Sequence, residues 1–343
     1  MDPIKKKIIN MHAGLKYCLC AILMLISFRI RAQQDVQFSQ YAFNGLSVNP
    51  AYAGYKDALY LNCNYRQQWT GLPGAPRTAG VSVDGPLHPM KSRTAIGLGL
   101  QLTNDMLGPQ KSYSVYGSYS YIISLDDDNT RRLSFGLGIG ISQYHLDGNS
   151  LQYFDPEDAV FPAGGVNAFS PDARFGIFYH SPSFFISASV LDLFSNVITS
   201  DFKWKGYNYE NIRKTRHLYL SAGCMAPISE HLKFKPSLML KDDLNGPTAV
   251  DLTTMLLIDQ VLWIGGSYRT SVPIWKKELP SRLEQRNAAS AIIEYYISGR
   301  YRIGYAYDLN INQMRDAQGG SHEISIGILF PSRKFSVYSP RYF

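Results

Sequence analysis

The sequence has little cysteine and little net charge once its first 32 residues are set aside. Those residues hold six Lys or Arg and one Asp, so the whole-chain charge of +7 leaves about +2 for the remainder. The sequence pI of about 9.0 therefore says little about a nucleic-acid partner, and none is expected. Only Cys63 and Cys224 follow residue 32. A small exported domain held together by disulfides would contain more cysteines.

Residues 1–32 have the pattern of a secretory signal peptide. Basic residues precede an apolar run, Tyr17–Phe28, and Ala32 offers a cleavage site. The arginines close to Ala32 are unusual there, so an uncleaved membrane anchor is the alternative. The apolar run is, however, shorter than the roughly 20 residues that a spanning helix needs. Lipidation of Cys18 or Cys20 is excluded because a large residue precedes each of them.

After residue 56 the chain lacks the hydrophobic periodicity of an amphipathic helix. Apolar residues instead alternate with small or polar ones, as in "LSFGLGIGIS" of residues 133–142. Successive side chains of a β-strand point to opposite faces, so this alternation predicts strands. The glycines argue against helix, because each costs about 1 kcal/mol relative to alanine in a helix interior.

Fourteen such segments follow one another, and most are about 8 to 13 residues long. They lie near 57–69, 77–85, 94–104, 111–123, 133–146, 173–181, 184–191, 216–226, 232–241, 248–258, 261–270, 287–298, 301–310 and 320–330. A membrane-spanning strand needs about 9 to 11 residues, whereas soluble strands average about 5 to 6. Long connections (147–172, 192–215 and 271–286) alternate with tight turns such as Pro182–Ser183. This plan is typical of an outer-membrane barrel with periplasmic turns and termini.

A large secreted β-sandwich is the alternative fold, since it also alternates and can also follow a signal peptide. The nearly pure Leu, Ile, Val, Phe and Tyr faces favour the barrel, because a sheet closed on a polar interior needs lipid outside. Aromatic residues near strand ends match interface girdles: Tyr113, Tyr121, Tyr295, Tyr301 and Trp69. The last strand, "HEISIGILF", ends in Phe330. We therefore predict an all-β, transmembrane antiparallel β-barrel over residues 57–330, with long extracellular loops and a C-terminal tail, 331–343.

The stretch "QFSQYAFNGLSVNPAYAG", residues 37–54, precedes the first strand and carries no charge. Because of this position, segment 33–56 is expected to start in the periplasm. It is suited to plug the barrel or to dock a periplasmic partner, and a merely extended lead-in is the alternative. The candidate residues for plugging or docking are Gln40, Tyr41, Asn44, Asn49, Pro50 and Tyr52.

No motif for metal binding or catalysis emerges from the sequence. The run Asp126–Asp128 could bind calcium, but a calcium site needs about 6 to 8 oxygen ligands, and a solvated turn is the simpler interpretation. His322 and Glu323 adjoin on a predicted strand and so face opposite ways. Zinc spacings and a nucleophile elbow are not found. We expect no enzymatic activity, no metal and no cofactor.

Four stretches resemble the PorP/SprF family of outer-membrane proteins, which is associated with type IX secretion and gliding motility. They are "FSQYAFNGLSVNPAYAG", "YRQQWTGLPGAPRT", "GLGLQLTNDMLGP" and "GSHEISI". The motif positions include Arg66, Trp69, Pro73, Asn104, Gly108, His322 and Glu323. The resemblance covers about Val36–Phe330. It implies a multi-pass, fourteen-stranded outer-membrane barrel of a Gram-negative bacterium, without enzymatic chemistry. It also implies a role in export or surface retention of large adhesins, together with periplasmic secretion or gliding components.

Two functions stay open: an accessory and anchoring barrel, or a passive porin or small-solute transporter. An open porin should line its lumen with opposed charge clusters, whereas the predicted lumen faces carry glycine, serine and tyrosine, which favours a filled interior. Aromatic residues of the long loops are the candidate contacts for a secreted adhesin or its C-terminal domain, unless they fold inward and cap the lumen. They are Phe154, Phe161, Phe202, Trp204, Tyr207 and Tyr209. Outer-membrane lipid is the other expected partner, and Cys63 and Cys224 are expected to stay unpaired on opposite sides of the barrel.

Overall fold

The alternating segments form strands throughout the computed structural model. It describes residues 38–88, 93–150, 165–195, 200–204, 207–212, 215–244, 246–272, 274, 288–311 and 315–330. The predicted signal peptide and C-terminal tail lie outside the described residues. No helix among the residues described is long and apolar enough to cross a membrane.

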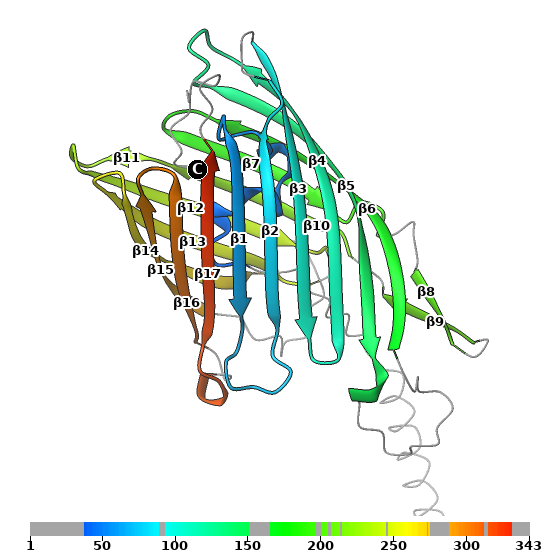
Figure 1. The fold of residues 1–343 in the computed structure, drawn as a ribbon. Helices are drawn as coiled ribbons and strands as arrows, with labels where there is room; N and C mark the ends of the chain where they lie inside the picture. The colour runs from blue at the N-terminus through cyan, green and yellow to red at the C-terminus, as the bar shows by residue number, and fades with distance from the viewer. Residues whose placement is uncertain are drawn as a thin grey trace, which may run out of the picture. The chain divides into compact units, whose positions relative to one another are not determined.

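Fourteen of the described strands close into one antiparallel barrel (Figure 1). They are β1 (Leu59–Gln67), β2 (Arg77–Pro86), β3 (Thr94–Leu107), β4 (Gln110–Ser124), β5 (Arg132–Asp147), β6 (Gly165–His180), β7 (Phe184–Leu191), β10 (His217–Cys224), β12 (Leu232–Asp242), β13 (Thr248–Ile258), β14 (Leu262–Val272), β15 (Ala288–Ile297), β16 (Tyr301–Asn310) and β17 (Ser321–Phe330). Sequence neighbours pair with one another, and β1 closes the ring by pairing with β17. A short β11 (Ala226–Pro227) pairs with the start of β12. The predicted barrel and its strand count are confirmed.

The barrel has two ends that differ in their connections. The end that carries the connections after β1, β3, β5, β7, β12, β14 and β16 is called the loop end. The other end, called the turn end, carries tight turns such as Pro182–Ser183, together with the start of β1 and the end of β17. The 3-10 turns η3 (Gly148–Ser150) and η4 (Arg315–Ala317) lie in loop-end connections.

Strand β6 begins earlier than predicted. The chain is paired with β5 from Gly165 onward, so residues 165–172 of the predicted loop 147–172 are strand. Phe169, expected on that loop, lies on β6 with 58% of its surface exposed. The sequence hid this strand because Pro171 and short polar residues interrupt the alternation. The long β5 nevertheless offers backbone partners as far as Asp147.

The predicted loop 192–215 is also not free of strand structure. It contains a separate two-stranded hairpin, β8 (Ser200–Trp204) and β9 (Tyr207–Ile212). The hairpin links β7 to β10 at the loop end, and β8 lies against β6.

The two faces of the wall follow the predicted alternation. On β1, Leu59 and Tyr65 are exposed while Asn62 and Arg66 are buried. The four girdle tyrosines are 41–50% exposed on the outer face: Tyr113 45%, Tyr121 41%, Tyr295 50% and Tyr301 48%. Both remaining cysteines are free, as predicted, and they lie on β1 and β10. The outer face is therefore apolar and the inner face polar, as in a membrane barrel.

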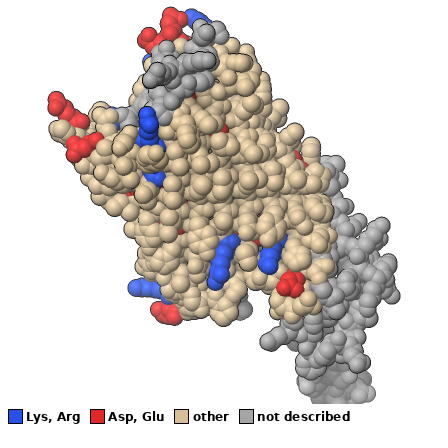
Figure 2. All heavy atoms as spheres, viewed as in Figure 1, with Lys and Arg blue, Asp and Glu red and all other residues tan. Residues whose placement is uncertain are grey.

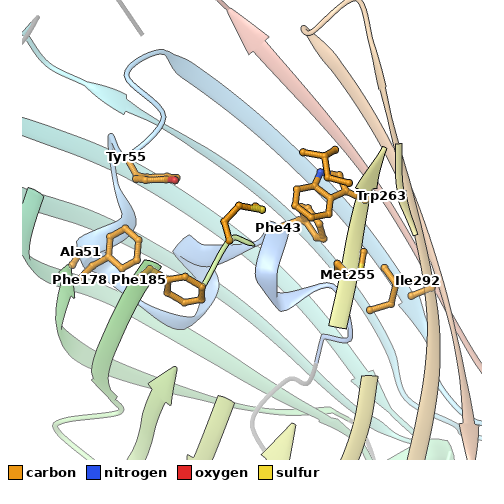
Figure 3. Close-up of a cluster of buried hydrophobic side chains, with 11 residues drawn as sticks. Phe43, Ala51, Tyr55, Phe178, Phe185, Met255, Trp263 and Ile292 are labelled. Carbon is orange, nitrogen blue, oxygen red and sulfur yellow. The ribbon is translucent and has the colours of Figure 1, made fainter. Parts of the chain in front are cut away.

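The chain before β1 occupies the lumen, and residues 38–58 are called the plug segment (Figure 1). It forms three short helices: η1 (Tyr41–Phe43), α2 (Gly45–Val48) and η2 (Pro50–Tyr52). Most of its described side chains are buried. Its apolar residues form the main buried cluster together with side chains from the surrounding strands (Figure 3).

Candidate functional site

Ionised side chains join the plug segment to the wall near the loop end. Arg66 of β1 donates hydrogen bonds to Asp308 of β16 at 2.5 Å and to Glu323 of β17 at 2.9 Å. The backbone N–H of Ser39 donates to Glu323 at 2.7 Å, and its hydroxyl donates to Asp308 at 2.6 Å. All four side chains are buried. This group, called the ion cluster, fixes the start of the plug segment to three neighbouring strands.

Other predicted plug residues bond to different parts of the wall. The Nε2 of Gln40 donates to a backbone carbonyl of β17 at 3.1 Å. The hydroxyl of Tyr41 donates to Thr253 of β13 at 3.1 Å. Asn44 accepts a hydrogen bond from the Nδ2 of Asn62 on β1 at 3.3 Å. Uncharged polar side chains thus satisfy buried groups without adding charge.

Asn49 fixes the middle of the plug segment to the far wall. Its Oδ1 accepts a hydrogen bond from the N–H of Ala51 at 2.8 Å and so caps η2. Its Nδ2 donates to the Ser187 hydroxyl on β7 at 2.7 Å and to the Ile177 carbonyl on β6 at 2.9 Å. Pro50 stands at the first position of η2, where a missing N–H costs nothing. One amide therefore orients a helix and holds it to two strands.

Glycines on the inner face leave room for the plug segment. A Cβ at Gly136 on β5 would lie 2.1 Å from the backbone N of Ala51, and one at Gly97 on β3 would lie 2.0 Å from the carbonyl O of Ala53. Both distances are far below van der Waals contact, so a side chain would displace the plug segment. Gly117 on β4 faces outward, and a Cβ there would have no neighbour nearer than 3.9 Å. The strand glycines on the inner face thus mark the path of the plug segment.

Aromatic rings form the second part of the plug interface (Figure 3). Phe43 packs edge-on against Trp263 of β14, with ring centroids 6.0 Å apart. The Nζ of Lys235 on β12 lies 5.5 Å from the Phe43 ring centroid. On the other side, Tyr52 packs against Phe178 of β6 with centroids 4.5 Å apart. A desolvated cation over a ring gains about 2 kcal/mol, so the rings stabilise both the plug and a buried charge.

The plug segment crosses the lumen from near the loop end to the turn end. Ser39 is held beside Arg66, one residue before the loop-end limit of β1. At the other end, Asp57 accepts two hydrogen bonds, at 2.6 and 2.9 Å, from Arg132, the first residue of β5. The sequence led us to expect that the segment starts at the periplasmic turn end, and for its described part this is wrong. The described segment thus runs from the loop-end side of the lumen to the turn end, where β1 begins.

A small pocket remains at the loop-end side of the plug segment. Its lining includes Phe38, Tyr41 and Val48 of the plug and Arg174, Lys241 and Arg269 of the wall. The Nε of Arg269 donates to Asp251 at 2.6 Å. Plug residues form one side of this space and wall residues form the other.

One inward ion pair and its neighbouring hydrogen bond were not singled out by the sequence. Arg302 of β16 donates to Glu294 of β15 at 2.9 Å and to the side-chain oxygen of Asn62 at 2.6 Å. Asp308 of the ion cluster was also missed. Their inward positions in the strand alternation could have marked them, because a buried charge must be paired.

The motif positions named from the sequence fall on opposite faces of the wall. Arg66 and Glu323 belong to the ion cluster inside. His322 faces outward, and its Nδ1 lies 2.7 Å from the hydroxyl of Tyr305. The prediction that His322 and Glu323 face opposite ways is therefore confirmed. Asn104 also faces outward, on β3.

Three further motif positions lie in loop-end connections. Trp69 donates its backbone N–H to the Ser321 hydroxyl at 3.2 Å. Gly108 adopts a φ of 55° in the turn between β3 and β4 and donates its N–H to Gly74 at 2.9 Å. Pro73 is exposed in the same region. These residues shape the rim and form no group of reactive side chains.

Four of the six predicted partner contacts lie on the β8–β9 hairpin. The register pairs are Phe202–Tyr209 and Trp204–Tyr207. Directly opposite positions share a face, so all four aromatic positions lie on one face of the hairpin. Lys203 and Asn208, also a register pair, lie on the other face. The remaining candidates, Phe154 and Phe161, lie outside the described residues.

The acidic run Asp126–Asp128 forms a hydrogen-bonded turn between β4 and β5. The hydroxyl of Thr130 donates to Asp126 at 2.5 Å, and the N–H groups of Thr130 and Arg131 also donate to it. The Thr130 hydroxyl, followed by these N–H groups, holds the pKa of Asp126 below its usual range. Asp127 pairs with Arg93 at the surface. Among the residues described, no three His, Cys, Asp or Glu side chains are grouped to hold a metal ion.

Comparison with known proteins gives one family match. A family model described as "Type IX secretion system membrane protein PorP/SprF" matches residues 30–328 of the chain. This range contains the plug segment and nearly all of the barrel strands. No curated protein sequence matches the chain.

Solved structures with the same kind of barrel are only distantly similar. A Pseudomonas aeruginosa FadL homologue is 10% identical, with 85% of this chain and 94% of that chain covered and a TM-score of 0.45. The Ralstonia pickettii toluene transporter TbuX is 9% identical, with 86% and 94% covered and a TM-score of 0.47. The Acinetobacter baumannii outer-membrane protein Omp33 is 9% identical, with 81% and 100% covered and a TM-score of 0.43. Likenesses at this level carry no functional argument.

Proposed function

The chain belongs to the PorP/SprF family of type IX secretion system membrane proteins, and from this membership we propose that it is a plugged barrel that anchors a secreted protein. The barrel lies in the outer membrane. Long connections of such barrels face the outside and short turns face the periplasm. The loop end is then extracellular, and the exported partner is an adhesin-type protein or its C-terminal domain.

The observation that carries this proposal is the occupied lumen. The plug segment is bonded to the wall at Ser39, Asn49 and Asp57, which are near its start, middle and end. A barrel filled in this way offers surfaces to partners rather than a path for solutes. A passive porin or small-solute transporter needs a continuous watery path, so the occupied lumen counts against that alternative. The proposed role needs no enzymatic chemistry and no cofactor.

The aromatic face of the β8–β9 hairpin is the proposed contact for the exported partner. Interfaces are enriched in Tyr, Trp and Phe, and a few such residues usually carry most of the binding free energy. The hairpin presents four aromatic positions on one face and stands at the loop end. The turn end is left for the periplasmic secretion or gliding components.

A pair of double variants tests the contact. Replacing Trp204 and Tyr207 with alanine removes one aromatic register pair, and replacing Lys203 and Asn208 with alanine changes the opposite face of the same hairpin. Both proteins should assemble as barrels, which heat-dependent gel mobility can verify. Cells with the aromatic double variant should release the adhesin into the medium, whereas cells with the control variant should retain it.

Either of two results would overturn the proposed contact. If the aromatic double variant still retains the adhesin at the control level, the hairpin face is not the contact. If both double variants release it equally, the hairpin matters only as a whole and its aromatic face has no special role. Crosslinking from turn-end positions in intact cells would then show whether the decisive partner is periplasmic.

A further inference from the structure

The outer face of the barrel has almost no ionised side chains. Among the outward positions of the described barrel strands, Arg77 on β2 and Lys111 on β4 are the only Lys or Arg residues. Figure 2 shows basic side chains near one another on the lower part of a largely uncharged wall, with an acidic side chain beside them. Neither residue forms an ion pair with a described acidic residue. Contacts with described acidic residues therefore do not explain why two cations lie on a lipid-facing wall.

The two cations lie close together. Arg77 is opposite Met106 on β3, and Met106 is opposite Lys111 on β4. Neighbouring strands are about 4.8 Å apart, so the two Cα atoms are roughly 10 Å apart on the same face. His145 on β5 is opposite Lys111 and continues the row.

This row stands where the apolar band of the wall ends. One step toward the middle of the barrel on the same face are Tyr113, 45% exposed, and its register partner Asn104. The next step brings Val115 and Leu102, which begin the apolar band. Aromatic girdles mark the headgroup level of membrane barrels. At the loop end, the row therefore lies at the level of the outer-leaflet headgroups.

We propose that Arg77 and Lys111 bind the phosphate groups of a phosphorylated glycolipid of the outer leaflet, of the lipid A type. Arginine offers a planar pair of donors to phosphate, and lysine adds a point charge. A cation on the lipid face is costly at the midplane and costs little near the interface, so this position suits an anionic headgroup.

The test uses the full-length protein in nanodiscs, with lipid A carrying two phosphates as the probe and native mass spectrometry as the readout. The R77Q/K111Q double variant removes both charges and keeps polar side chains. Arg315→Gln, exposed on η4 at the same end, removes a charge away from the wall and is the matched control. We expect the double variant to bind lipid A at least fivefold more weakly and the control to bind like the wild type. Dephosphorylated lipid A should bind the wild type as weakly as the double variant binds lipid A.

Three outcomes would overturn the assignment. Equal binding of lipid A by the wild type and the double variant would show that these cations hold no phosphate. Equal binding of the dephosphorylated lipid would show that phosphate is not the recognised group. A photocrosslinker at position 111 that captures a protein and no glycolipid in intact cells would make the patch a protein contact.

Discussion

The inner and outer faces of the barrel wall carry opposite kinds of residue. Inside, Arg66, Glu323 and Arg302 are at most 2% exposed, whereas outside, Ile139 is 72% and Leu137 is 56% exposed. In a water-soluble protein the outer residues would form the core. Here lipid covers them, and a segment of the same chain covers the polar face. The comparison teaches that the interior of this barrel depends on the plug segment, while the exterior depends on the membrane.

The largest effect should come from filling the space that the plug needs. Gly136→Leu places side-chain atoms where the backbone of Ala51 lies, whereas Gly117→Leu adds the same atoms to the lipid face. Overpacking costs about 1–3 kcal/mol and occasionally more, and here backbone must move, so we expect a loss of at least about 3 kcal/mol at position 136. The free energy of unfolding in urea, measured in lipid vesicles, checks this. Equal stability of the two variants would refute the inner–outer distinction.

The next effect concerns buried against exposed ion pairs. Arg66→Met leaves Asp308 and Glu323 buried without their cation, which should cost about 3–5 kcal/mol. Arg93→Met breaks the exposed pair with Asp127 and should cost less than about 1 kcal/mol. The same unfolding measurement applies to both. Similar losses for the two variants would show that the ion cluster is no more important than a surface pair.

A smaller loss is expected from a single polar contact of the plug. Asn49→Ala removes the cap of η2 and the hydrogen bonds to β6 and β7, and should cost about 2 kcal/mol. Asn149→Ala, in exposed η3, should change stability by less than about 0.5 kcal/mol. Unfolding curves of both variants and the wild type give these free-energy differences. An Asn49→Ala variant as stable as the wild type would mean that the hydrogen bonds of Asn49 do not stabilise the plug segment.

The smallest effect is expected at the turn end. The depressed pKa of Asp126 means that its ionised form stabilises the turn at neutral pH. This contribution is lost as the pH falls through the folded-state pKa, which lies below the usual aspartate value. Asp126→Ala should therefore flatten the acid side of the stability profile slightly and leave barrel assembly unchanged. Added calcium should shift neither protein, and a calcium-dependent stabilisation of the wild type would contradict the turn interpretation.

The sequence predicts the barrel well because a period of two is a local signal that each strand carries by itself. It fails where tertiary contacts decide, as at β6, where Pro171 breaks the pattern and the pairing with β5 restores the strand. The ion cluster joins Ser39 to residues more than 250 positions away, and no local pattern encodes such a register. The direction of the plug segment was wrong for the same reason. The place of the plug segment before β1 in the sequence fixes the end of the barrel where β1 starts. It does not fix the path of the chain that leads to that point.

The electrical conductance of the purified full-length protein in a planar bilayer tests the central claim most directly. If the plug segment, residues 38–58, closes the lumen, the protein should insert without producing a steady channel above the baseline of protein-free membranes. The Gly136→Leu variant, where it assembles, should show openings that Gly117→Leu lacks. A large, steady open channel in the wild type would contradict the account, because ions would then cross a lumen that the plug segment is proposed to seal.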